Sequence, residues 1–163
     1  MKFARYSSIV VVIALLIFAI LGFDSLRTAI SEKNERQQSA IKAAQHYSDI
    51  KQIEHVYTYS GVDSYDVVIG ISEEDERIAV WVPRLHITKS NKLFIRKLED
   101  GIDEQQAIDI VTNKLETKKI VSVTLGMENE VPLWEITYID SDDSYCYYYV
   151  SFDGGEFLKR YCI

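Results

Sequence analysis

The sequence lacks the short motifs that mark common catalytic and cofactor sites. Its 163 residues contain no nucleophile elbow, no glycine-rich phosphate loop, no HExxH pair and no paired CxxC. The three histidines, His46, His55 and His86, are nine and thirty-one residues apart, which is not a metal-ligand spacing. We therefore expect a protein that is not an enzyme, with no metal, no cofactor and no small-molecule substrate.

An excess of positive charge is also missing. The net charge is −7, and Lys2 and Arg5 are the only charged residues before Asp24, so the chain from Asp24 onward carries −9. Nucleic acids and other anionic polymers attract clustered lysine and arginine. The composition therefore argues against a nucleic-acid partner, and against docking on anionic lipid or wall polymers by charge alone.

What the sequence does have near its start is a long apolar segment. Tyr6 to Phe23 (YSSIVVVIALLIFAILGF) contains eighteen residues without a charge, at the low end of what spans a hydrocarbon core of about 30 Å. Two basic residues precede it, so the positive-inside rule predicts a cytoplasmic N-terminus and an extracellular remainder. The alternative is a cleaved signal peptide, but AILGFDS is a poor cleavage site and no lipoprotein cysteine lies nearby. We predict a cytoplasmic tail at 1–5 and a single-pass signal anchor in the cell membrane at 6–23.

A helix followed by strands is predicted after the anchor. Residues 25–48 contain neither proline nor glycine, and most of their apolar residues recur at three- and four-residue steps. The part SEKNERQQS has no apolar residue, so we interpret 24–39 as a helical stalk. Segments rich in aromatic and β-branched residues then predict four strands, Ile53–Tyr59, Tyr65–Ile71, Arg77–Pro83 and Lys92–Leu98.

The second half of the chain repeats this order. Asp103 is suited to the N-cap of a helix whose apolar stripe includes Ala107 and Val111. Four further strands are predicted at Ile120–Met127, Val131–Ile139, Ser144–Phe152 and Glu156–Ile163.

The two halves also match in sequence. An offset of 67 places Ala40 on Ala107, and one more residue of shift places VWV at Val80 on YYV at Tyr148. The predicted fold class is α+β: an N-terminal transmembrane helix and helical stalk, then two tandem units at 40–100 and 101–163. Each unit is expected to pack a helix on an antiparallel sheet.

The two cysteines lie at the ends of the last predicted hairpin. If Gly154 is the centre of its turn, the residue numbers of each cross-strand pair add up to 308. Val150 then pairs with Leu158, and Cys146 pairs with Cys162. These cysteines would be direct cross-strand neighbours with β-carbons about 4.5–5.5 Å apart, and an exported domain permits a disulfide. A two-residue turn would put them on opposite faces. A disulfide and two packed thiols remain as alternatives.

Strand alternation divides SYCYYYVSF into two faces. The core face is predicted to contain Cys146, Tyr148, Val150, Phe152, Leu158 and Cys162. The candidate partner surface is the other face, with Tyr145, Tyr147 and Tyr149. Trp81 and Trp134 lie at similar places in the two repeats; they are core residues in the simplest interpretation, and part of a partner surface in the alternative.

The second unit resembles a PepSY-type domain, with the cystatin-like arrangement of a helix on a sheet. The resemblance rests on the Ala-Ile helix DEQQAIDIVTNKL, the Trp-Glu strand PLWEITYID, and the last hairpin with Asp153 and Phe157. With the anchor, the stalk and a first unit containing VWVPR, nearly the whole chain resembles the TseB-like (YpmB) cell wall elongation regulators of Gram-positive bacteria.

This resemblance implies a non-enzymatic, extracytoplasmic interaction protein. Its implied role is to regulate peptidoglycan elongation through a penicillin-binding transpeptidase or another wall-elongation component. PepSY-like units imply one alternative, an inhibitor or regulator of an exported peptidase. The cysteine pair is a departure from the family pattern.

Overall fold

The computed structural model describes residues 31–84 and 93–163. The predicted tail and signal anchor, at 1–5 and 6–23, lie outside this part of the chain. Within the described ranges, no helix combines the length and the apolar character that crossing a membrane requires. The chain divides into two compact units, residues 1–39 and residues 40–163.

A helix covers residues 31–47. In the first unit, its residues 31–39 are almost all exposed, and Glu32 forms an ion pair with Arg36 at 3.7 Å. An exposed pair at this spacing stabilises a helix by only about 0.3–0.5 kcal/mol. In the second unit, Ala40 and Ala44 are fully buried, and these small side chains let the helix approach a sheet closely.

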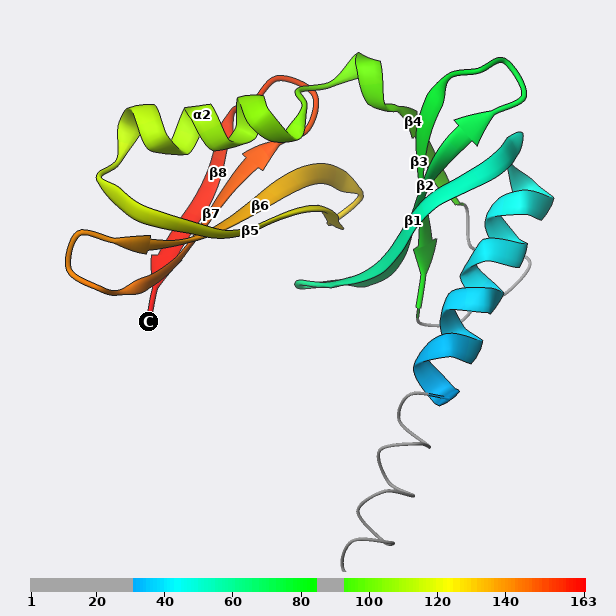
Figure 1. Ribbon diagram of the computed structural model, residues 1–163, viewed down its shortest axis with the longest axis horizontal. Coiled ribbons are helices and arrows are strands. Elements are labelled where there is room, and N and C mark those ends of the chain that lie inside the picture. Colours follow the sequence, from blue (N-terminus) through cyan, green and yellow to red (C-terminus); the bar gives the residue numbers. More distant parts are fainter. Residues whose placement is uncertain (1–30, 85–92) are drawn as a thin grey trace, which may run out of the picture. The chain divides into compact units, whose positions relative to one another are not determined.

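The first sheet is an antiparallel meander of four strands in the order β1-β2-β3-β4 (Figure 1). Its strands are β1 (Ile50–Ser60), β2 (Ser64–Ser72), β3 (Arg77–Pro83) and β4 (Phe94–Lys97). β4 ends one residue earlier than predicted, because a 3-10 turn, η1 (Leu98–Asp100), begins directly after it.

Both faces of the first sheet are covered. One face packs Val68, Val80 and Val82 against the helix residues Ala40 and Ala44. The opposite face, which includes Val67 and Trp81, belongs to a larger core shared with the second sheet. Burial on both faces explains why β2 and β3 read as nearly continuous apolar segments.

The second helix, α2 (Glu104–Lys114), begins at the predicted cap. The Asp103 carboxylate accepts a hydrogen bond from the Gln106 backbone at 2.7 Å, and the Gln106 side chain accepts one from the Asp103 backbone at 2.9 Å. This reciprocal capping box satisfies two backbone N–H groups that the helix cannot pair internally. Ala107 and Val111 form its buried stripe.

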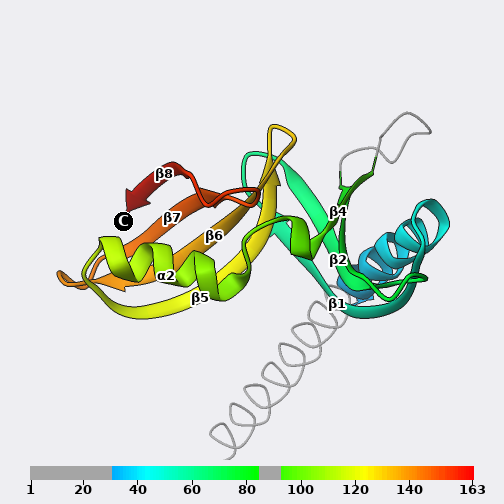
Figure 2. The same cartoon turned by 90° about the horizontal axis from the view of Figure 1, so that it is seen from above.

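The second sheet repeats the meander in the order β5-β6-β7-β8, and α2 lies along one of its faces (Figures 1 and 2). Its strands are β5 (Thr117–Glu128), β6 (Val131–Asp140), β7 (Tyr145–Ser151) and β8 (Phe157–Cys162). The predicted α+β class with two antiparallel sheets is therefore confirmed for the described residues.

Candidate functional site

A disulfide joins the last strand to its neighbour. Tyr145 and Ile163 exchange both backbone hydrogen bonds, at 3.2 and 2.9 Å, so the adjacent pair is of the close, non-hydrogen-bonded type. That pair is Cys146 and Cys162, which are bonded to each other with their α-carbons 4.1 Å apart. Cys146 is fully buried while Cys162 is exposed, so the bond ties the edge strand β8 to a core strand.

The predicted register of this hairpin is correct only at its open end. The pairs from Cys146↔Cys162 to Tyr149↔Lys159 match, but Val150 pairs with Phe157 and not with Leu158. Gly155, at φ 71°, closes a turn in which the Gly155 backbone donates to the Ser151 carbonyl, and an extra residue is then absorbed in β8. Leu158 is consequently 41% exposed, and the prediction that it joins the core is wrong.

The face of the second sheet turned away from α2 carries a group of four tyrosines, which we call the tyrosine face: Tyr145, Tyr147, Tyr149 and Tyr161. The Tyr147 and Tyr161 rings stack with centroids 4.8 Å apart, and Tyr149 and Tyr161 stack at 6.0 Å. Tyr145 meets Tyr147 edge-on at 5.7 Å. Tyr145 and Tyr161 are exposed and Tyr147 is half-buried, so this face offers accessible aromatic surface.

Tyr149 is a correction to the predicted partner surface, because only 2% of it is exposed. Its hydroxyl lies 3.0 Å from that of Tyr161, and the Lys159 ammonium lies 4.3 Å from the centre of its ring. Residues from the neighbouring strand therefore cover it. Tyr161, which the sequence-based prediction omitted, takes its place on the accessible side.

The two tryptophans are also corrected as surface candidates. Trp81 is 0% exposed and donates its indole N–H to the Gly126 carbonyl at 3.1 Å; Trp134 is 7% exposed and donates to the Ile102 carbonyl at 2.9 Å. They are not equivalent in the repeat, since Trp81 lies in the third strand of its sheet and Trp134 in the second. Both hold core elements together and present no accessible ring.

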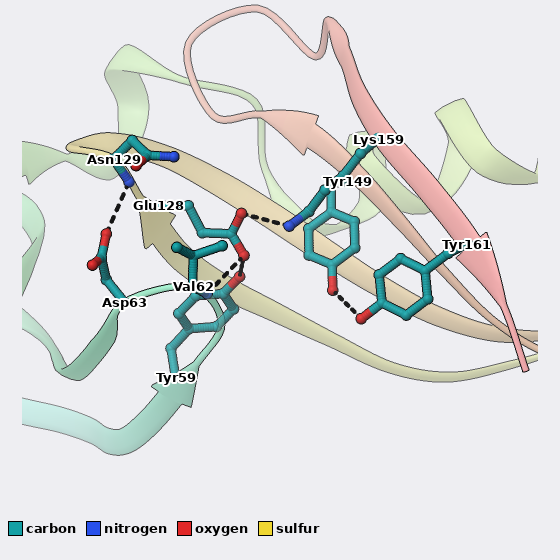
Figure 3. A network of polar contacts seen from close by, with 8 residues as sticks. All are labelled: Tyr59, Val62, Asp63, Glu128, Asn129, Tyr149, Lys159 and Tyr161. Carbon is teal, nitrogen blue, oxygen red and sulfur yellow. Dashed lines mark hydrogen bonds and ion pairs between the residues drawn. The ribbon is translucent and has the colours of Figure 1, made fainter.

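A carboxylate connects the tip of the β1–β2 hairpin to the tyrosine face (Figure 3). Glu128 accepts hydrogen bonds from the Tyr59 hydroxyl at 3.0 Å and from the Val62 backbone at 3.3 Å, and it pairs with the Lys159 ammonium at 2.5 Å. Burial by itself would raise the pKa of Glu128, but the hydrogen bonds from Lys159, Tyr59 and Val62 hold it below the usual value. Asp63 adds a contact to the Asn129 backbone at 3.0 Å.

A groove of about 510 Å³ lies beside this network. Its lining includes Tyr147 and Tyr161 from the tyrosine face, Val62 from the hairpin tip, and the carboxylate of Glu135. Glu135 lies directly across from Tyr149 in the sheet, and burial raises the pKa of its carboxyl. The groove thus combines stacked aromatic rings with a partly desolvated acid.

A second cleft of about 560 Å³ is also lined by charged side chains, and two of them already have structural partners. Arg77 forms an ion pair with Glu54 at 2.9 Å, and Asp103 caps α2. The Tyr57 hydroxyl donates to the Leu125 carbonyl at 3.1 Å. Because these groups stabilise the fold, the groove on the tyrosine face is the better candidate for binding.

The histidines and the cysteine pair carry the remaining side-chain atoms that commonly bind metals. His46 lies on the first helix and His55 on β1, while His86 is outside the described residues. Asp140, Cys146 and Cys162 bring three donor atoms within 4.8 Å of one another, but both sulfurs are engaged in the disulfide.

The residues that sequence reasoning missed are charged ones at the edge of the tyrosine face: Glu128, Glu135 and Lys159. Glu135 falls on the same side of its strand as the tyrosines, so period-two alternation alone was sufficient to find it. Glu128 contacts Tyr59 across 69 positions of sequence, and no local pattern indicates such a contact.

Comparison with known proteins agrees with this architecture. A model of the cell wall elongation regulator TseB-like domain matches residues 39–83. A curated relative from Bacillus subtilis (strain 168), the probable cell wall elongation regulator TseB, is 31% identical over 134 residues, which are 82% of this chain and 81% of the relative. The chain belongs to the TseB-like family.

A second family model and a solved structure extend this assignment. A model of the peptidase propeptide and YPEB domain (PepSY) matches residues 101–161, which contain α2 and the second sheet. The structure of the YpmB protein from Bacillus subtilis is similar with a TM-score of 0.72 and 31% identity, over 77% of this chain and 96% of that one. The TseB-like family assignment is therefore confirmed, and so is the resemblance of the second repeat to a PepSY domain.

Proposed function

We propose that this protein is a membrane-anchored, extracytoplasmic interaction protein that regulates peptidoglycan elongation through a penicillin-binding transpeptidase. The observation that carries the proposal is the match, over most of both chains, to a relative named as a probable cell wall elongation regulator. The role is regulatory rather than enzymatic in this proposal, and it needs no cofactor.

The geometry supports binding to another protein. The first sheet has both faces covered, whereas the second presents the tyrosine face with a groove and accessible rings. Tyrosine supplies large contact area at low conformational cost, and it is enriched at the centres of protein interfaces.

In-cell photocrosslinking tests the partner. A photoreactive amino acid replaces Tyr145 or Tyr161 on the tyrosine face, and Thr112 on the exposed side of α2 serves as the matched control position. We expect a penicillin-binding protein to be captured from the two tyrosine positions and not from Thr112. Failure to capture any wall-elongation component from all three positions contradicts the proposal.

The membrane anchor at 6–23, preceded by the tail 1–5 and followed by the stalk 24–39, is part of the same proposal and has its own test. The full chain should resist extraction from membranes at alkaline pH, because an uncharged segment of this length is retained by the bilayer. External protease should remove the C-terminal units from intact spheroplasts, since the basic residues favour a cytoplasmic N-terminus. Release of the protein at alkaline pH, or its protection from protease, contradicts this topology.

A second candidate function is regulation of an exported peptidase. It is favoured by the match of residues 101–161 to the domain described for peptidase propeptides. Titration of the full chain against wall-associated and secreted proteases tests it, with inhibition at stoichiometric amounts as the expected result. Unchanged rates for every protease contradict this alternative.

A further inference from the structure

The groove on the tyrosine face contains a carboxylate that forms no direct ion pair among the described residues. Glu128 is neutralised by Lys159 at 2.5 Å. Glu135 lies in the same cross-strand row as Tyr149 and Lys159, and it takes part in none of the ion pairs that the described residues form. It is half-buried and interacts with the Tyr149 hydroxyl. A partly desolvated anion of this kind is stabilised when a cation is supplied from outside.

Aromatic rings border this carboxylate. Thr137, Tyr147 and Tyr161 form the next cross-strand row, and the Tyr147 and Tyr161 rings stack at an angle of 22°. Tyr161 is 47% exposed, so one of these rings remains accessible for stacking. Planar cations prefer such a site, because a ring face is electron-rich and a carboxylate accepts parallel hydrogen bonds.

The protein already uses the same chemistry internally. The Lys159 ammonium pairs with Glu128 and lies 4.3 Å from the centre of the Tyr149 ring. Glu135 with Tyr147 and Tyr161 repeats the combination of an acid and aromatic rings, but Glu135 forms no ion pair of its own: Lys159 attracts it only at longer range and pairs with Glu128. The net charge of −7 also favours the approach of a positively charged partner.

We propose that this groove binds the guanidinium group of an arginine side chain presented by a partner polypeptide, with Glu135 as the ion-pair acceptor and Tyr161 as the stacking surface. Arginine fits better than lysine because its guanidinium is planar, stacks on aromatic rings and binds a carboxylate in a bidentate manner. An uncharged sugar can donate hydrogen bonds to Glu135 but leaves its negative charge unneutralised. This inference rests on the proposed interaction role and names the chemistry of its anchor residue.

Binding of a small probe to the full chain in detergent micelles tests the inference. The probes are N-acetyl-arginine amide, its uncharged citrulline analogue and N-acetyl-lysine amide, and binding is followed by NMR of isotope-labelled tyrosine rings. We expect the arginine probe to shift the Tyr147 and Tyr161 resonances in a saturable way. The citrulline probe should not do so, and the lysine probe should bind more weakly. Equal binding of arginine and citrulline probes, or of arginine and lysine probes, overturns the assignment.

Two variants that remove the same charge distinguish specific binding at Glu135 from nonspecific attraction by the negative net charge of the protein. Glu135→Gln should weaken binding of the arginine probe by about 10-fold or more, because a charged hydrogen-bond acceptor is lost. Glu74→Gln removes the same charge from the exposed β2–β3 turn and should leave binding nearly unchanged. Tyr161→Phe should retain binding while Tyr161→Ala loses it. An equal effect of the two Gln variants, or none from either, overturns the site.

The two proposals fail in different ways. If a wall-elongation component is crosslinked to the tyrosine face but Glu135→Gln changes neither crosslinking nor probe binding, the arginine site is wrong and the proposed function stands. If the arginine probe binds as expected but no wall-elongation component is captured, the site stands and the proposed function is wrong. Unchanged thermal unfolding of Glu135→Gln confirms that the variant is folded.

Discussion

The two sheets share one topology, but they are used differently. The first sheet is packed between helix residues 40–47 on one face and the shared core on the other, and its Trp81 is completely buried. The second sheet packs α2 on one face and presents the tyrosine face on the other. Trp81, in the third strand of the first sheet, and Tyr149, in β7, occupy equivalent positions in the two repeats. Tyr149 lies among aromatic rings that are partly accessible.

On the proposed function, the first sheet serves as a scaffold and the second as the recognition surface. Glu128 links the two roles, because it holds the β1–β2 hairpin tip against the strand that carries the groove. The proposal therefore makes the repeated fold asymmetric in function, and it predicts different consequences for substitutions in the two sheets.

The largest expected effect is on the scaffold. Trp81→Ala should lower the free energy of unfolding by about 3–5 kcal/mol, because it leaves a cavity and removes the hydrogen bond to the Gly126 carbonyl. Tyr161→Ala, on the accessible side of the second sheet, should cost less than about 1 kcal/mol. Denaturant unfolding of both variants measures the difference. Equal losses contradict the distinction between scaffold and surface.

The disulfide is a second difference between the two sheets, because both of its cysteines lie in the second sheet. Cys162→Ser opens a link between residues 16 positions apart and should lower the free energy of unfolding by about 3 kcal/mol. Reductant should reproduce this loss in the natural chain and have no effect on the variant. A mass that does not increase by two hydrogens on reduction contradicts the bond.

The junction between the sheets should depend on pH. Because the pKa of Glu128 is lowered in the folded protein, its stabilising contribution is complete above the ordinary value of 4.5 and is lost as the pH falls through the folded value. Glu128→Gln should therefore destabilise the protein by about 1–3 kcal/mol at neutral pH, and the difference should shrink on acidification. A difference that stays constant from neutral to strongly acidic pH argues against a role for the charge.

The smallest effect concerns the start of the second helix. Asp103→Ala removes one side of the capping box and should cost about 1 kcal/mol. Arg36, its counterpart at the offset of 67, lies inside the first helix, so Arg36→Ala removes only an exposed ion pair. Hydrogen exchange should show faster opening at the start of α2 in the first variant, and little change in the second. Comparable changes in the two variants count against the cap.

Much of the fold was predictable because its signals are local. Segments rich in aromatic and β-branched residues predicted the strands, Asp103 predicted the start of α2, and the two-residue period predicted that Tyr145 and Tyr147 share a face. The pairing of Cys146 with Cys162 followed from the position of the turn.

The rest depended on information that a local pattern does not contain. The left-handed conformation of Gly155 places the extra residue on one strand only, and this shifts Leu158 out of the core. Tyr149 is buried by Tyr161 and Lys159 from another strand, which alternation within β7 cannot indicate.

The central claim is that recognition belongs to the second sheet, and one measurement in cells tests it most directly. The rate of peptidoglycan incorporation is compared between cells whose only copy carries Tyr145→Ser with Tyr161→Ser, and cells whose copy carries Tyr47→Ser with Ile95→Ser. Both pairs remove two exposed apolar side chains, the first from the tyrosine face and the second from the first repeat. At equal protein levels, we predict that incorporation changes only with the first pair. An effect confined to the second pair, or equal effects of both, contradicts the claim.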